Sequence, residues 1–250
     1  MMQACRYGST NPRAEENAIN IQHLPRDADE IRDSQWYHEH YWKERALRLL
    51  LHEAAVPKGM SLLDYGCGRG EFLAMAATAG FETTGLDMDE DCVARARRYG
   101  KAELVHPDDY LESLAAGSVD VISCFHVLEH VENPKRLLAG MRRVARRYVL
   151  LAVPNLRCSR KWNSRKPERV NEGHLQGWDR ETLRNLAETH CGLRLVAFTS
   201  DMTKLPSVGS RISRLFGPAA EKWISLNVFS RLWPLKCISI IALFEVPSKT

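Results

Sequence analysis

The stretch Leu62-Leu63-Asp64-Tyr65-Gly66-Cys67-Gly68-Arg69-Gly70-Glu71-Phe72 decides the fold of this 250-residue chain. An apolar run leads through three closely spaced glycines into a helical pattern, and glycine permits the positive φ angles that a tight turn needs. A ligand can also approach the backbone of such a turn closely, because glycine has no side chain. The stretch therefore predicts a strand, a ligand-binding turn and a helix of an α/β domain.

The residue that follows the third glycine argues against a phosphate ligand. A dinucleotide-binding turn needs G-x-G-x-x-G, with the pyrophosphate on the helix N-terminus. Glu71 stands where the last glycine of that pattern would be, and its carboxylate would repel a pyrophosphate. Asp64 at the strand end instead suits a cationic ligand such as S-adenosylmethionine (SAM), which carries an ammonium and a sulfonium and no phosphate.

Acidic residues also end the next two predicted strands. Asp87 follows Gly66 by 21 residues, the distance at which an acidic side chain reaches ribose hydroxyls in this architecture. Asp108 and Asp109 follow the third strand, where a carboxylate can accept a hydrogen bond from the adenine amine. Three acidic strand ends in order predict a nucleoside pocket.

Short apolar runs alternate with helical stretches along the rest of the chain. This order predicts an α/β, Rossmann-like, doubly wound and mostly parallel seven-stranded sheet with helices on both faces. The predicted strands are residues 61–64, 83–87, 103–106, 119–125, 148–153, 194–198 and 238–246, and the predicted helices are residues 71–79, 91–99, 134–145 and 180–190.

Three further segments complete the domain organisation. Residues 1–33 are polar and lack periodicity, which predicts a flexible N-terminal arm before a single domain at 34–250. Residues 34–56 have the spacing of an amphipathic helix that packs across the domain. Residues 200–236 contain short amphipathic pieces, which predict a small helical cap insertion before the last strand.

Composition sets the class of protein. With 44% hydrophobic residues the chain can form one large core. Its seven cysteines are odd in number and never form C-x-x-C, which argues against a thiolate metal site and favours a reducing compartment. No apolar run reaches the ~20 residues that span a bilayer, so a soluble, cytoplasmic protein without a transmembrane segment is expected.

Positive charge is concentrated between Lys135 and Arg169, where twelve Lys or Arg face one acid, Glu168. One group falls at the helix end opposite the predicted pocket and is expected to be a solvated face: Arg142, Arg143, Arg146 and Arg147. A second group follows the fifth strand, over the predicted acceptor pocket: Arg157, Arg160, Lys161, Arg165, Lys166 and Arg169. This second group indicates either an anionic acceptor or the solubility of a long loop.

The candidate catalytic residues are His126, Glu129, His130 and His174. The first three stand at i, i+3 and i+4, so they share one face if the chain turns helical after Phe125. His174 precedes the next helix and can return to the same rim. The group could hold a divalent metal ion, His126 or His174 could act as a general base, or Glu129 and His130 could secure the loop.

Four segments together resemble the class I SAM-dependent methyltransferases: LLDYGCGRGEF, GLDMDED, HPDD and VDVISCFHVLEHVENP. The resemblance covers residues 61–153, and more weakly continues to residue 198. It implies a set of cofactor-binding residues around the methionine part, the ribose, the adenine edge and the near side of the donor: Asp64, Gly66, Cys67, Gly68, Gly70, Asp87, Met88, Asp108, Asp109, Phe125 and His126.

The segment around Glu129 also resembles metal-assisted O-methyltransferases that modify catechol-like quinone precursors or the 3′-terminal ribose of small RNAs. Those families place acid-x-x-Glu-His after the fourth strand, whereas this chain has His126 at the first acidic position. Metal-free small-molecule methyltransferases also carry HVLEHV.

The leading expectation is SAM-dependent O-methylation of a hydroxyl on a small, lipid-linked or sugar-linked acceptor. Two alternatives remain open: a metal-assisted 2′-O-methyltransferase that acts on an RNA 3′ end, and a catalytically inactive SAM-binding scaffold. Neither the acceptor nor the oligomeric state is set by a motif of this sequence.

Overall fold

The computed structural model describes residues 36–54, 58–105, 110–158, 173–203 and 206–248. Their centre is one seven-stranded sheet. Its strands are β1 (Ser61–Tyr65), β2 (Glu82–Asp87), β3 (Lys101–Leu104), β4 (Val119–Phe125), β5 (Ala145–Pro154), β6 (Arg194–Ser200) and β7 (Ser239–Glu245). The predicted arm, Asp108, Asp109 and most of the basic loop lie outside the described residues.

The sheet has the strand order β3-β2-β1-β4-β5-β7-β6. The strands from β3 to β5 run parallel, and β7 runs antiparallel to β5 and to β6. The chain winds from β1 outward to β3 and then returns to β4, so the winding reverses between β1 and β4. Ligands of such sheets bind at that reversal, beyond the carboxyl ends of the strands.

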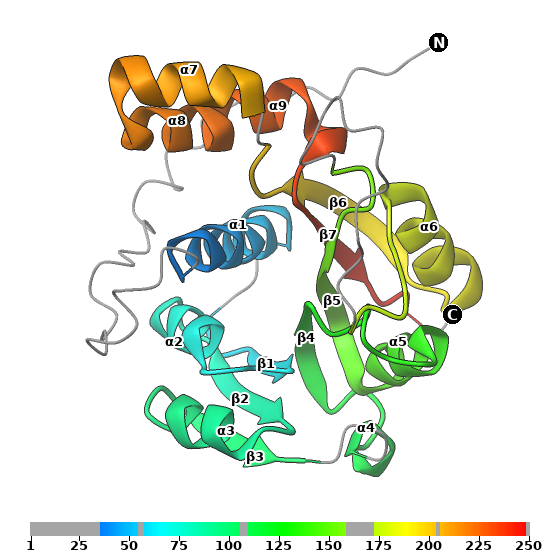
Figure 1. The fold of residues 1–250 in the computed structure, drawn as a ribbon. Coiled ribbons are helices and arrows are strands. Elements are labelled where there is room, and N and C mark those ends of the chain that lie inside the picture. Colours follow the sequence, from blue (N-terminus) through cyan, green and yellow to red (C-terminus); the bar gives the residue numbers. More distant parts are fainter. Residues whose placement is uncertain (1–35, 55–57, 106–109, 159–172, 204–205, 249–250) are drawn as a thin grey trace.

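Helices cover both faces of the sheet (Figure 1). They are α1 (Trp36–Ala54), α2 (Glu71–Thr78), α3 (Glu90–Ala96), α4 (Tyr110–Ser113), α5 (Pro134–Val144), α6 (Arg180–Asn185) and the π-helix η4 (Leu186–His190). Leu47 of α1 and Phe72 of α2 belong to one buried cluster, and Leu138 of α5 and Leu183 of α6 belong to another. The predicted doubly wound architecture is confirmed.

Some predicted boundaries were wrong. The third strand was expected at residues 103–106 and lies at Lys101–Leu104. It is an edge strand in which Ala102 is buried and Leu104 is 51% exposed, so its alternation gives a weak signal. The helix expected at 180–190 widens into η4 after Asn185, and the short helix α4 was not predicted at all.

Side-chain caps mark the starts of α5 and α6, among other helices. Asn133 accepts a hydrogen bond from the backbone N–H of Arg136 at the start of α5, where Pro134 fixes the first turn. Asp179 and Thr182 form a reciprocal capping box at the start of α6. These caps hold the ends of both helices at the edge of the sheet that carries the reversal point.

The expected cap insertion is present between β6 and β7. It consists of α7 (Pro206–Phe216), α8 (Pro218–Ile224), the π-helix η5 (Ser225–Phe229), α9 (Ser230–Leu232) and the 3₁₀ helix η6 (Pro234–Lys236). Figure 1 shows α7 and α8 at the top, beyond α1 and away from the sheet. Gly209 permits their close approach, because a Cβ there would lie 2.7 Å from Oε1 of Glu221.

The arginines at the end of α5 and the start of β5 are exposed at Arg143, Arg146 and Arg147, as expected of a solvated face, and two of them also bind other parts of the fold. Arg143 donates to the backbone oxygens of Leu111 and Leu114, which lie in and after α4. Arg146 forms an ion pair with Asp120. None of the helices in the described ranges combines the length and apolar character needed to cross a bilayer.

Candidate active site

The glycine turn between β1 and α2 is held in left-handed conformations. Gly66, Gly68 and Gly70 have φ angles of 76°, 54° and 86°. A Cβ at Gly66 would lie 2.4 Å from Cγ2 of Val127, whereas a Cβ at Gly68 would meet nothing within 4 Å. The turn is therefore closed by protein at Gly66 and open at Gly68, where a ligand can approach the backbone.

Asp87 lies beside this open position. Its Oδ2 accepts the backbone N–H of Gly68 at 2.8 Å, and its Oδ1 accepts that of Asp89 at 3.0 Å. An ionised carboxylate has further lone pairs on both oxygens, so Asp87 can still accept hydrogen bonds from two neighbouring hydroxyls. Met88 is 70% exposed and can cover an adjoining ring. This end of β2 fits the ribose side of a nucleoside.

Asp64, at the end of β1, is 2% exposed. Its Oδ1 accepts a hydrogen bond of 2.7 Å from Oγ of Ser123. Burial raises the pKa of its carboxyl to about 7, although the Ser123 hydrogen bond and the nearby charge of Lys43 act in the opposite direction. A cationic ligand group beside Asp64 would favour the ionised form.

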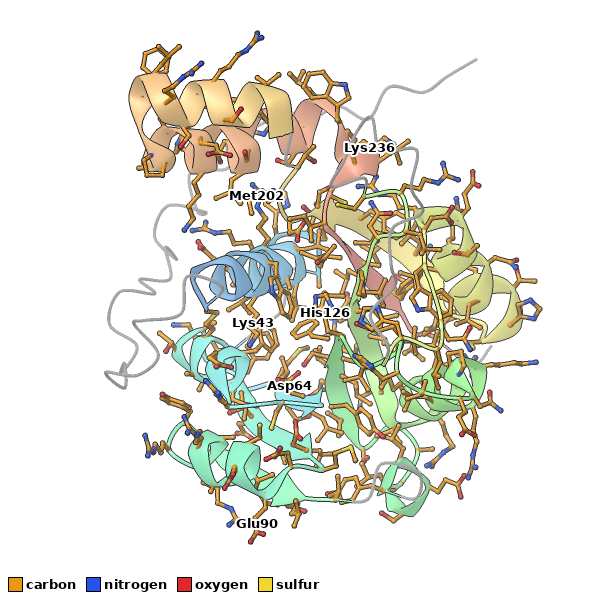
Figure 2. The ribbon with its side chains drawn as sticks, in the orientation of Figure 1. Lys43, Asp64, Glu90, His126, Met202 and Lys236 are labelled. Atoms are coloured by element: carbon orange, nitrogen blue, oxygen red, sulfur yellow. The ribbon has the colours of Figure 1, made fainter. Side chains whose placement is uncertain are left out.

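Lys43 of α1 reaches the start of α2. Its Nζ lies 2.9 Å from Oε2 of Glu71, and the two side chains are only 13% and 12% exposed. Figure 2 shows Lys43, Asp64 and His126 around the same region, between α1 and the carboxyl ends of β1 and β4. Lys43 was not predicted as a site residue, because it fits an ordinary amphipathic helix and stands 28 residues before Glu71.

Two predicted cofactor residues, Phe125 and Cys67, have side chains that are buried in the core. The ring of Phe125 is buried and packs edge-on against Trp42 and Phe72, with centroid distances of 5.0 Å and 4.7 Å. The thiol of Cys67 is buried in a small cluster with Leu73 and Val93 under the turn. Both side chains therefore support the site from the core.

His126 follows β4 with a φ of 54°, a left-handed value that no other non-glycine residue of the described ranges adopts. The chain bends there and enters a turn at residues 128–130, so the condition that the chain turns helical after Phe125 is not met. The His126 N–H donates to the oxygen of Ala152, and its ring packs edge-on against Trp42 at 4.9 Å. Strained backbone of this kind is concentrated at functional sites.

Glu129 links the candidate catalytic residues. Its side chain is 1% exposed, and its Oε1 lies 3.2 Å from Nδ1 of His126 and 4.0 Å from Nε2 of His130. Its Oε2 is buried and has no hydrogen-bond partner among the described residues. The Glu129 backbone oxygen accepts the N–H groups of Leu175 and Gln176, which brings the His174 segment to this turn.

His130 and His174 complete a potential metal-binding group. The rings pack edge-on with centroids 4.9 Å apart, and Nδ1 of His130 lies 2.8 Å from the oxygen of Gly173. Ligand atoms of Glu129, His130 and His174 all lie within 4.8 Å of one another. His126 is not part of this group, so the four predicted residues share one region but divide into a metal-type trio and a separate histidine.

A second buried acid, which the sequence did not indicate, lies on the other side of His126. Nε2 of His126 is 3.5 Å from Oγ of Ser239, and Asp201 accepts the Ser239 N–H at 2.9 Å. Burial raises the pKa of the Asp201 carboxyl. These residues come from separate elements, β7 and the start of the cap, so no sequence spacing could reveal them.

The profile of a methyltransferase domain family matches residues 36–197, which include the glycine turn and the His126 region. The chain belongs to this methyltransferase family. The expected resemblance to class I SAM-dependent methyltransferases is thereby confirmed, and the helix at α1 is part of the family's domain.

The methyltransferase is similar to curated ubiquinone biosynthesis O-methyltransferases. It is 37% identical over 107 residues to that of Hahella chejuensis and 35% identical over 108 residues to that of Thiobacillus denitrificans. Each match covers 40% of this chain, and they cover 45% and 46% of the two relatives. The match spans less than half the length of these relatives.

Solved structures share the fold of the methyltransferase at low identity. A SAM-dependent methyltransferase from Archaeoglobus fulgidus has a TM-score of 0.57 and 19% identity, with 85% of this chain and 100% of that chain covered. Magnesium protoporphyrin IX methyltransferase from Synechocystis, solved with bound SAM, has a TM-score of 0.55 and 17% identity, with 93% and 91% covered.

Arg157 is the one predicted acceptor-loop cation that the described residues include. It forms ion pairs with Asp179 at 2.8 Å and with Glu181 at 3.6 Å. Its charge is therefore balanced by the methyltransferase itself at the start of α6. The other five cations of that group lie outside the described residues, so the expectation of an anionic acceptor stays a prediction.

Proposed function

We propose that the protein transfers the methyl group of SAM to a hydroxyl of a small, lipid-linked or sugar-linked acceptor, with His126 as the general base. The observation that carries this proposal is the contact between buried Glu129 and Nδ1 of His126, at the end of β4 beside the glycine turn. The similarity to relatives named as O-methyltransferases supports the choice of a hydroxyl.

The residues at the strand ends suit each part of the donor. Asp87 can accept from ribose hydroxyls, and the open backbone at Gly68 leaves room for the nucleoside. Asp64 can face an ammonium group, and Lys43 can face a carboxylate if its pairing with Glu71 is shared. The protein thus offers a group of matching charge for the ammonium, for the carboxylate and for the ribose hydroxyls of SAM.

SAM supplies a methyl group that its sulfonium already activates, so the protein must align the acceptor and remove its proton. Glu129 can accept the Nδ1–H of His126, which fixes the tautomer in which Nε2 is free to take a proton. The bend at His126 and the contact with Trp42 hold the ring in place. His126 is then the proton acceptor and Glu129 its positioning residue.

The test compares His126→Gln and Glu129→Gln with His52→Gln, a control in an exposed histidine of α1. Removal of a general base lowers kcat by about 10²–10⁴. We expect that loss of kcat for His126→Gln, and no change of kcat for His52→Gln. Radiolabelled SAM with a panel of catechols, with and without a prenyl tail, is the assay. Full kcat in His126→Gln would exclude the base.

A metal-assisted reaction is the second candidate, because Glu129 has a buried unpaired Oε2 beside two imidazoles. The Gly173 oxygen can accept Nδ1–H of His130 and so leave Nε2 as a ligand atom, which is the usual support of a metal-binding histidine. Imidazole and carboxylate suit Zn²⁺, Mn²⁺ or Co²⁺. A bound ion would supply a Lewis acid for the acceptor oxygen.

Chelation followed by dialysis separates the two candidates. The base proposal expects full activity in the chelator, whereas the metal candidate expects loss of activity and its return with Mg²⁺, Mn²⁺ or Co²⁺. Calorimetric titration of each ion into the protein and into His174→Ala gives a readout that does not depend on turnover. Filter binding of RNA oligonucleotides at low salt tests the RNA-end alternative, and SAM binding without transfer to any acceptor would favour the scaffold.

A further inference from the structure

The cap carries an unusual concentration of exposed apolar side chains. Eleven large hydrophobic residues are exposed within the described ranges, and seven of them lie between Val208 and Leu235. Leu215 and Phe216 are each 72% exposed, and Trp223 and Leu232 are each 61% exposed. Clustered exposure of this kind marks an interaction surface more often than scattered exposure does.

The exposed side of α7 combines apolar and cationic residues. Val208, Arg211 and Leu215 stand at i, i+3 and i+7, so they form one stripe along the helix, and all three are exposed. Arg214 and Phe216 are also exposed, beside the end of this stripe. The exposed side of α7 therefore carries apolar and cationic side chains together.

Positively charged residues predominate in the cap. Residues 206–236 include five Lys or Arg and one acid, Glu221. Glu221 is half-buried, and its carboxylate lies close to Gly209 in the packing between α7 and α8. The acid is thus held between the two helices, whereas Arg211, Arg214 and Arg231 are exposed. The outer surface of the cap is cationic as well as apolar.

We propose that the outer surface of the cap, formed by α7, α8 and α9, docks on an anionic lipid bilayer. Apolar and aromatic side chains that enter the headgroup boundary, together with Arg and Lys that attract anionic lipids, are the features of an interfacial helix. A second copy of this chain fits less well, because a symmetric contact would oppose the three exposed arginines with three more.

The inner side of the cap connects this surface to the active site. Arg45 of α1 donates to the oxygens of Ser200 and Leu226, at the base of the cap. Asn155, after β5, donates to the oxygen of Leu235, and Ser239 directly after the cap touches His126. Figure 2 shows Met202, which precedes the cap in the chain, and Lys236, the last residue of the cap, above His126. Docking would therefore place the cap between the membrane surface and the His126 side of the site.

This inference extends the proposed function, since a docked enzyme can receive a lipid-linked acceptor directly, but docking can be measured without turnover. The experiment is co-sedimentation of the full chain with vesicles of phosphatidylcholine alone or mixed with phosphatidylglycerol, at low and high salt. We expect at least about tenfold tighter binding to the anionic vesicles, and weaker binding at high salt because screening reduces the attraction.

Matched variants locate the surface. Leu215→Ser with Phe216→Ser should weaken vesicle binding at least about tenfold, because the apolar contact is lost. Arg211→Ala and Arg214→Ala should each weaken anionic binding by roughly fivefold. Leu104→Ser, at a 51% exposed position on the far edge strand, is the control and should bind as the wild type does. Melting temperature and SAM affinity should stay unchanged in every variant.

Three outcomes would overturn the inference: equal binding to neutral and anionic vesicles, equal binding by wild type and the Leu215/Phe216 variant, or a concentration-dependent dimer that this variant abolishes and vesicles do not affect. Failure of the proposed function looks different. In that case the wild type would bind anionic vesicles and SAM but would methylate neither prenylated nor water-soluble catechols.

Discussion

The carboxyl group of Asp64 connects the burial of the β1 end to the charge of the donor. In the folded protein its pKa is about 7, whereas its usual value is 3.8. Between these two values the folded state retains a proton that the unfolded chain releases. Its contribution to stability is therefore largest below pH 3.8 and is lost as the pH rises through about 7.

Binding of a cation beside Asp64 should have the opposite pH dependence. A positive ligand favours the ionised carboxylate, so SAM affinity should rise by up to about tenfold per pH unit below pH 7 and level off above it. The Asp64→Asn variant should show a flat profile. Calorimetry in two buffers of different ionisation enthalpy measures both the affinity and the proton released, and a flat wild-type profile would contradict the ammonium contact.

Asp87 should contribute to SAM affinity through hydrogen bonds to the ribose. Asp87→Ala should weaken binding by about 1–3 kcal/mol, since charge-assisted hydrogen bonds are lost. Asp91→Ala is the control, because Asp91 is an exposed acid four residues further along. Calorimetric titration with SAM checks the effect, with a melting curve to show that Gly68 remains in place without its bond to Asp87. Equal affinity of the two variants would exclude the ribose contact.

Residue-level prediction succeeded where a single position has a topological meaning. Asp64 and Asp87 could be placed because parallel strands bring their carboxyl ends to one edge. Lys43 and Asp201 could not be placed, because their proximity to the site depends on how α1 and the cap pack. The left-handed φ of His126 also could not be predicted, because non-glycine residues seldom adopt a positive φ and the presence of a histidine does not by itself indicate one.

In the turn between β1 and α2, Gly70 is needed both for its positive φ and for the absence of a side chain. Comparison with Gly59, which precedes β1, can separate these two properties. Gly59 and Gly70 have φ angles of 84° and 86°, but only Gly70 faces protein, with Cα of Ala96 2.7 Å from the position of a Cβ. Gly59→Ala carries the backbone penalty alone. Gly70→Ala should be further destabilised by about 1–3 kcal/mol, because it pushes α3 away.

Chemical denaturation of both variants measures the difference in the free energy of unfolding. A smaller SAM affinity should accompany the loss of stability in Gly70→Ala alone, because α3 follows Asp87 and Met88 directly. Equal destabilisation by the two substitutions would show that α3 can move away from the turn without loss of stability.

Element-level prediction followed the hydrophobic period. The buried strands β4 and β5 and the helix α5 were found close to their observed positions, because their apolar runs are long. The i, i+3 and i+4 spacing of His126, Glu129 and His130 did not decide between a helix and a turn, since that spacing also occurs in a single turn such as Val127–His130. The widening of α6 into η4 depends on packing and has no counterpart in the sequence pattern.

At the scale of the whole molecule, ligand binding should stabilise the fold by mass action. S-adenosylhomocysteine at 100 times its Kd should add about 2.7 kcal/mol to the free energy of unfolding. For a domain of this size that corresponds to a rise in Tm of about 5–10 °C. A thermal-shift assay checks this rise in Tm, and NAD, the control, should leave Tm unchanged. A rise in Tm with NAD and none with S-adenosylhomocysteine would contradict the proposed SAM site.

The sheet order was less accessible to prediction than the strands themselves. A strand that is buried on both faces reads the same in either direction, so the antiparallel course of β7 leaves no mark in its sequence. Its insertion between β5 and β6 is likewise a property of the assembled sheet. Hydrophobic periodicity alone therefore could not predict the direction and position of β7.

The position of β7 has a consequence for biogenesis. Among the described strands β6 pairs with β7 alone, and β7 also covers the side of β5 that faces away from β4. Until β7 has been translated, one edge of β5 therefore has unpaired backbone N–H and C=O groups, and β6 has no neighbouring strand to pair with. A chain that ends before Ser239 would lack β7 and is expected to aggregate. Chaperones would therefore have to protect the incomplete chain until β7 is synthesised.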